Sequence, residues 1–149
     1  MRTLKNRTAA LLAIVWLVAC AAKPAGAPEL LLDRSVCGNC GMLISDLAYS
    51  SSVRGSDGKE KSFDDLHCLS EYARHSGDAH LQIWVHDFDG EEFLEVAKAH
   101  FVIAPSIHAP MGGSVVAFAN REAAVRFARG SGGHVIDTFQ GLLREEKKS

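Results

Sequence analysis

The sequence lacks the motifs on which common enzyme chemistries depend. It has no glycine-rich phosphate loop, no serine nucleophile elbow and no pair of carboxylates at catalytic spacing, and its GGS and GSGG segments are typical of turns. The formal net charge is −2 at pH 7, which argues against nucleic acid as a partner. We therefore expect a protein that is not an enzyme and that does not bind nucleic acid.

Sulfur is also scarce, with four cysteines and three methionines in 149 residues. The two methionines after the first residue, Met42 and Met111, stand in CGNCGML and HAPMGGS, where no periodic apolar segment explains them. Cysteine and methionine sulfur are soft donors that select Cu(I), and a thioether has no proton to lose. A Cys-Gly-Met segment together with a distant methionine would supply three sulfurs to such an ion. The alternative is ordinary turn packing around Gly41, Gly112 and Gly113.

The N-terminal segment has the pattern of a secretion signal. Basic Arg2, Lys5 and Arg7 precede an uncharged run over residues 8–19, which is too short to span a bilayer. The run ends in Leu-Val-Ala-Cys and resembles the lipobox of bacterial lipoproteins, which implies cleavage after residue 19 and lipidation of Cys20. The alternative is an uncleaved membrane anchor with an incidental cysteine.

The predicted lipid anchor sets the expected location. Several acyl chains hold a protein stably on a membrane, and Ala21 lacks the aspartate that retains such lipoproteins at the inner membrane, which implies the outer membrane, facing the periplasm. Residues 20–29 are rich in Ala, Pro and Gly and are expected to form a flexible spacer. Loss of residues 1–19 would remove three basic residues and change the formal net charge to −5.

The rest of the chain contains a repeat at an offset of 55 residues. Gly58, Phe63, Asp65 and Tyr72 match Gly113, Phe118, Asn120 and Phe127, and both copies continue as Ala-Arg-x-Ser-Gly. Each copy has an Asp or Asn at a helix N-cap position, then apolar residues at helical spacing, then a closing glycine. Each copy is therefore expected to contain one short helix.

Strand candidates surround these helices. They lie at residues 59–63 and 81–86 around the first helix, at 114–118 and 134–139 around the second, and at 47–54, 92–97 and 100–104. The sequence thus predicts an α+β fold of two tandem ββαβ units, residues 30–88 and 89–141, packed as one small domain. A charged tail is expected over residues 142–149.

The order of these segments resembles the NosL family of copper chaperones, lipoproteins that accessory systems use in maturing the copper centres of nitrous oxide reductase. The resemblance covers most of the chain after residue 20. It is carried by Cys20, Cys-Gly-Asn-Cys-Gly-Met at 37–42, Phe-Asp-Asp-Leu-His-Cys at 63–68, and Met111-Gly-Gly followed by Phe118 and the second helix. It implies a membrane-anchored Cu(I) chaperone with Cys40, Met42 and Met111 as ligands and with the tandem ββαβ fold. The implied recipient is nitrous oxide reductase or its ABC-type assembly complex.

Cys37 and His108 are additional ligand candidates. Cys37 forms a Cys-x-x-Cys pair with Cys40 where some family members have one cysteine, so it would be a fourth ligand, a redox partner or half of a Cys37–Cys40 disulfide. His108 lies three residues before Met111, and imidazole also suits copper.

Two other classes of function remain open. A thiol oxidoreductase would use Cys37 and Cys40, although such motifs open a helix after a strand, whereas here the motif precedes a predicted strand. A structural zinc site would combine Cys37, Cys40, His67 and Cys68. Cys68 aligns with Ala123 and is expected to be a small buried side chain, with His67 facing solvent.

Overall fold

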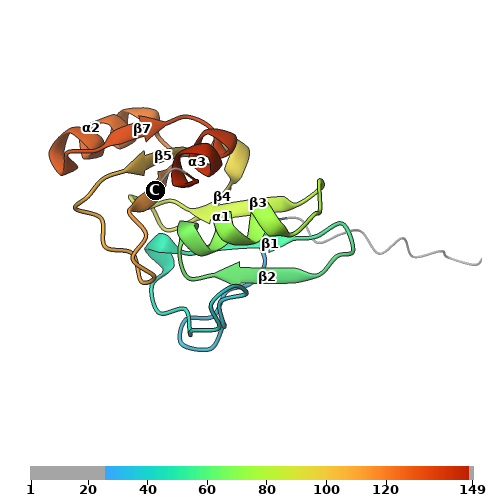
Figure 1. Ribbon diagram of the computed structural model, residues 1–149. Helices are drawn as coiled ribbons and strands as arrows, with labels where there is room; N and C mark the ends of the chain where they lie inside the picture. The colour runs from blue at the N-terminus through green and yellow to red at the C-terminus, as the bar shows by residue number, and fades with distance from the viewer. Residues whose placement is uncertain (1–25, 148–149) are drawn as a thin grey trace, which may run out of the picture.

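The computed structural model describes residues 26–147, so the predicted signal segment 1–19 and the lipidation site Cys20 lie outside the described residues. Within the described range the chain is a mixed fold of helices and sheets (Figure 1), which confirms the predicted α+β class. No helix in residues 26–147 has both the length and the apolar character needed to cross a membrane.

The first sheet is antiparallel and has the strand order β2-β1-β3-β4. Its strands are β1 (Ser51–Arg54), β2 (Glu60–Phe63), β3 (Gln82–His86) and β4 (Phe93–Glu95). Helix α1 (Leu66–His75) connects β2 to β3 and lies along the face of this sheet (Figure 1). The chain order from β1 to β3 is therefore strand, strand, helix, strand.

The second sheet has the order β6-β5-β7 and is also antiparallel. Its elements are β5 (His100–Ile103), β6 (Val115–Phe118), helix α2 (Arg121–Ser131) and β7 (His134–Ile136), followed by helix α3 (Phe139–Glu146). In the first sheet β1 lies between β2 and β3, and in the second sheet β5 lies between β6 and β7. Each strand-strand-helix-strand set therefore has its first strand in the middle.

The two longer helices begin in the same way. Asp65 caps α1 by accepting a hydrogen bond from the N–H of Cys68 at 2.9 Å, and Asn120 caps α2 by accepting one from Ala123 at 2.9 Å. A side-chain oxygen at the N-cap satisfies an N–H that has no partner inside the helix. Both predicted N-caps are confirmed, and Gly132 ends α2 with a left-handed φ of 69°.

The hairpin turns of the two sheets also have the same hydrogen-bond pattern. In turn 55–59 the N–H of Gly55 donates to the carbonyl of Lys59, and the N–H of Gly58 donates to the carbonyl of Gly55. In turn 109–113 the same two bonds run from Ala109 to Gly113 and from Gly112 to Ala109. Gly58 and Gly112 occupy the fourth position with φ of 80° and 78°, a region that favours glycine. By this criterion the counterpart of Gly58 is Gly112, one residue before the Gly113 that the sequence comparison pairs with it.

The hydrophobic core joins the two sheets. Alternate residues of the second sheet face opposite sides, so Phe101 packs with the first sheet, α1 and α3, whereas Val102 packs with α2. Burial of both faces explains the near-continuous apolar composition of β5 and β6. The cluster on the Phe101 side joins the two sheets, and its fully buried residues include Ile44, Val53, Phe63, Leu69, Val85, Phe101 and Leu142.

Four element predictions need correction. The strand expected over 92–97 ends at Glu95, where the 3-10 helix Val96–Lys98 follows. Residues 47–49 form a 3-10 helix rather than the start of a strand, because Asp46 accepts from the N–H of Ala48 at 2.9 Å. The strand expected over 134–139 ends at Ile136, because Thr138 caps α3 by accepting from Gly141 at 3.1 Å. The expected tail 142–149 belongs to α3 as far as Glu146, and Leu142 is fully buried there.

Candidate metal centre

Cys37 and Cys40 lie on a tight loop before the first sheet. The N–H of Cys37 donates to the carbonyl of Met42 at 2.8 Å, and the N–H of Gly41 donates to the carbonyl of Cys37 at 3.0 Å. Gly41 has a φ of 78°, which lets the chain reverse between these bonds. Cys37 also forms a parallel bridge to Ser62 of β2. These bonds fix the backbone of the loop against the first sheet.

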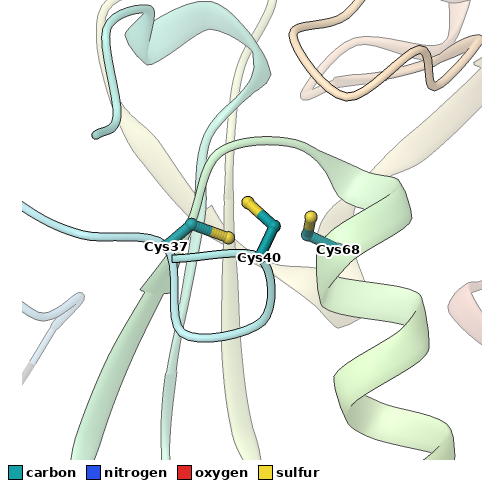
Figure 2. A group of neighbouring side chains, drawn as sticks. All are labelled: Cys37, Cys40 and Cys68. Atoms are coloured by element: carbon teal, nitrogen blue, oxygen red, sulfur yellow. The ribbon is translucent and has the colours of Figure 1, made fainter. Parts of the chain in front are cut away.

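Cys68 faces this loop from the first turn of α1. Figure 2 shows Cys37 and Cys40 on the loop and Cys68 at the start of the helix. The three sulfur atoms all lie within 4.8 Å of one another. Cys37 and Cys68 are only 2% and 1% exposed, whereas Cys40 is partly exposed. All three are free thiols, so the structure does not contain the Cys37–Cys40 disulfide considered above.

The role of Cys68 was only half predicted. Its burial is confirmed, and its alignment with Ala123 explains why the sequence indicates a small apolar side chain. The zinc alternative grouped its sulfur with those of Cys37 and Cys40, as the structure does, but the favoured ligand set of Cys40, Met42 and Met111 left it out. The available signal was the position of Cys68 three residues after a helix N-cap, in a chain with few sulfurs.

The three thiols differ in acidity. Burial opposes ionisation of Cys37, but backbone hydrogen bonds, chiefly from Cys40 and Asp64, outweigh it, and the pKa of Cys37 lies below its usual value. Burial raises the pKa of Cys40, and the neighbouring Cys37 raises it further. Burial, then the nearby Cys37 and Asp65, raise the pKa of Cys68. Of the three thiols, Cys37 therefore ionises most readily and Cys68 is held back from ionising by its burial.

The histidines do not join the cluster. Nδ1 of His67 lies 3.5 Å from Oε1 of Glu146, which directs the imidazole towards α3, and the side chain is 45% exposed. His108 is exposed. Among the described residues, the sulfur group that could hold a metal contains three cysteines and no histidine or carboxylate. The four-residue zinc set that includes His67 is therefore not assembled.

Met42 and Met111 present exposed side chains on two different loops. Met42 is 51% exposed and follows Cys40 by two residues. Met111 is 37% exposed and lies in the turn 109–113, where Pro110 and Gly112 occupy positions that suit them in a β-turn. Neither side chain belongs to the buried core, which agrees with their positions outside any periodic apolar segment.

The carboxylate of Asp65 links the Met111 turn to the helix that carries Cys68. Oδ2 accepts from the N–H of Met111 at 3.2 Å, while Oδ1 accepts from the N–H of Cys68 at 2.9 Å. Asp65 is fully buried, and a Cβ added at Gly113 would lie 3.3 Å from Cβ of His67. The backbone of the Met111 turn therefore packs against the first turn of α1, next to the thiol cluster.

Exposed apolar side chains gather on the same two loops. Within residues 26–147, the large hydrophobic residues with high exposure are Leu31, Leu32, Val36, Met42, Leu43 and Met111. All of them lie on the segment around Cys37 and Cys40 or on the Met111 turn. Such a concentration is typical of a surface that contacts another macromolecule.

The family profile of NosL matches residues 28–143, and this protein belongs to the NosL family. No curated protein matches the chain. Among solved structures, the chain is similar to the crystal structure of the copper chaperone NosL from Shewanella denitrificans, with a TM-score of 0.70 and 22% sequence identity. The similarity covers 78% of this chain and 96% of the other chain, and at this identity it establishes a shared fold.

Proposed function

We propose that this protein is a Cu(I) metallochaperone, which carries copper to a cuproenzyme under assembly and performs no catalysis itself. The observation that carries the proposal is the meeting of three free thiols, with sulfurs within 4.8 Å of one another, next to loops that present two exposed methionines. Thiolate and thioether sulfurs select Cu(I) over harder ions. Membership of the NosL family agrees with this assignment.

The ligands from which copper leaves are Cys40, Met42 and Met111. Cys40 is the partly exposed thiol of the three, and both methionines are exposed. A sulfur or imidazole of a partner can therefore approach an ion held by these residues. One thiolate and two neutral thioethers suit release, because each ligand can be replaced in turn by a ligand of the partner.

The recipient that we propose is nitrous oxide reductase or its ABC-type assembly complex. The exposed apolar residues around the two loops support docking there, because the centres of protein interfaces are enriched in methionine and depleted of charge. The lipid anchor at Cys20 would keep the chaperone at the outer membrane, facing the periplasm. We also propose that the two strand-strand-helix-strand sets are copies of one ββαβ pattern.

The other two functions have less support. A thioredoxin-like oxidoreductase needs its Cys-x-x-Cys at the start of a helix, but Cys37 and Cys40 lie in a loop and Cys37 is 2% exposed. A structural zinc site needs four ligands, and the cluster supplies three. The lowered pKa of Cys37 fits a soft-metal ligand as well as it fits a reactive thiol.

A competition titration tests the function. The reduced full chain, in detergent and without oxygen, is titrated with Cu(I) against a chromogenic chelator. One ion per chain is expected to bind, and Met42→Leu with Met111→Leu should weaken binding by at least about 10-fold, since even the loss of an outer-shell partner costs roughly 10–100-fold. Leu43→Ala, which alters a neighbouring exposed side chain, should leave the affinity unchanged.

The two possible negative results of this titration have different meanings. Absence of Cu(I) binding by the reduced full chain would contradict the chaperone function. Full affinity in the double methionine variant would leave the function in place but contradict the ligand set.

A further inference from the structure

The thiol of Cys68 is not required by the fold. Cys68 and Ala123 are each the third residue of a helix, and each donates its N–H to the N-cap side chain at 2.9 Å. Both positions are buried, at 1% and 8% exposure. Alanine fills this position in α2, so the start of the helix does not itself call for a sulfur in α1.

Cys37, like Cys68, does not belong to the proposed ligand set of Cys40, Met42 and Met111. Its sulfur is buried, yet it lies within 4.8 Å of both Cys40 and Cys68. An ion about 2.3 Å from each of three sulfurs, the length of a zinc–thiolate bond, would hold them about 4.0 Å apart in a trigonal arrangement. The three sulfurs thus need to move by less than about 1 Å to enclose an ion.

We propose an inner Cu(I) position formed by Cys37, Cys40 and Cys68, which shares Cys40 with the outer position at Met42 and Met111. This inference rests on the proposed function and extends it, because copper would be held in the protein by three cysteines and presented to the partner by the methionines. Cys40 belongs to both positions because it is the partly exposed thiol of the cluster and precedes the exposed Met42 by two residues.

Movement of copper outward is a ligand exchange without oxidation or reduction. Bonds from copper to the sulfurs of Met42 and Met111 form as the bonds to Cys68 and Cys37 break, while the bond to Cys40 remains. Each thiolate that leaves copper takes up one proton from solvent, and the metal remains Cu(I).

The inner position also accounts for the choice of metal. Within residues 26–147, no histidine or carboxylate completes the group of three cysteines. Zinc in structural sites takes four ligands, whereas a site with only soft sulfur ligands suits Cu(I).

The test uses the full chain, reduced and in detergent, in four forms: wild type, Met42→Leu/Met111→Leu, the same double variant with Cys68→Ala, and Cys68→Ala alone. Each is titrated with Cu(I) against a chromogenic chelator, and sulfur coordination is measured by X-ray absorption at the copper edge. The double variant should keep one Cu(I) with three sulfur neighbours at reduced affinity. Adding Cys68→Ala should lower that affinity by a further factor of at least about 10, because loss of even an outer-shell partner costs roughly 10–100-fold.

Ser70→Ala in the double-variant background is the matched control, since Ser70 is also buried in α1. It should leave Cu(I) binding unchanged, and urea denaturation of the Cys68→Ala protein checks that it folds, as the alanine in α2 predicts. Complete loss of copper from the double methionine variant, with wild type still binding, would overturn the inner position but leave the proposed function standing. Residual binding that Cys68→Ala does not weaken would overturn it equally, whereas no binding by wild type would contradict the function itself.

Discussion

Asp65 connects the stability of α1 to the placement of Met111, and three substitutions separate the two effects. Asp65→Ala removes the cap of Cys68 and the acceptor for Met111 together. Asp65→Asn keeps one carbonyl oxygen for the helix cap, as Asn120 does in α2, but turns an amide NH₂ towards the N–H of Met111. Asn120→Ala removes the N-cap of α2 and leaves the residues around the thiol cluster unchanged.

The expected losses of stability follow from these contacts. An N-cap contributes about 0.5–2 kcal/mol, so this is the expected effect of Asn120→Ala. A hydrogen bond to a charged group contributes about 1.5–3 kcal/mol, so Asp65→Asn should lower the free energy of unfolding by about that amount through the Met111 contact alone. Asp65→Ala should combine both effects, at about 2–5 kcal/mol.

Urea denaturation of the metal-free proteins measures these differences, and the chelator competition described above measures Cu(I) affinity. Release of the Met111 turn in Asp65→Asn should weaken Cu(I) binding roughly 10–100-fold, as is typical for loss of an outer-shell partner, while Asn120→Ala should leave binding unchanged. Equal destabilisation by Asp65→Ala and Asn120→Ala would show that the bond to Met111 contributes nothing, and the argument would fail.

Three further predictions concern the fold. Gly133→Ala should destabilise the protein by about 1–3 kcal/mol, because a Cβ there would lie 2.5 Å from Cβ of Ala104. Gly130→Ala, where a Cβ would meet nothing within 4 Å, should instead stabilise α2 by about 0.5–1 kcal/mol. Equal urea midpoints for the two variants would contradict this contrast. Burial raises the pKa of Glu146, so its contribution to stability is present below its ordinary pKa and is lost as pH rises through the raised folded value. Glu146→Gln should remove this decline in unfolding free energy, and an unchanged pH profile would refute the assignment. The hydrogen bond from Arg121 lowers the pKa of Asp137, so that contribution is present above the ordinary pKa and is lost as pH falls through the lowered value. Because this pair is exposed, Asp137→Asn should cost less than about 1 kcal/mol at neutral pH, and a larger loss in urea denaturation would mean that the carboxylate has another structural role.

Local sequence rules predicted the elements that depend on neighbouring residues. The N-caps Asp65 and Asn120 and the two helices that follow them were predicted because caps and helical periodicity are local signals. Helix α3 was missed because charged residues dominate the end of the chain, although Thr138 and the buried Leu142 are a cap and an apolar anchor of the same kind.

The thiol cluster depends on contacts between distant residues, and the sequence showed only part of it. The Cys-x-x-Cys-Gly-Met segment was recognised, but the approach of Cys68 requires the loop to dock on β2 and α1 to start beside it. The repeat also pointed away from this role, because a match to Ala123 indicates packing. Cys68 and Ala123 share the small, buried side chain that the fold needs at this position, and the thiol is where the two copies differ.

The docking of the Cys37–Cys40 loop has a consequence for solubility. Strand β2 is the last strand on its side of the first sheet, and Cys37 and Gly38 cover it through the bridge to Ser62 and a hydrogen bond of 2.8 Å to the Ser62 carbonyl. An uncovered edge strand offers free N–H and C=O groups to the edges of other molecules, and folded proteins avoid association by blocking such edges. The segment that holds the thiols is thus also the cap of a sheet edge. Any event that pulls this segment away from β2 would expose a strand able to pair with a second chain, so that loss of the sulfur site and aggregation would occur together.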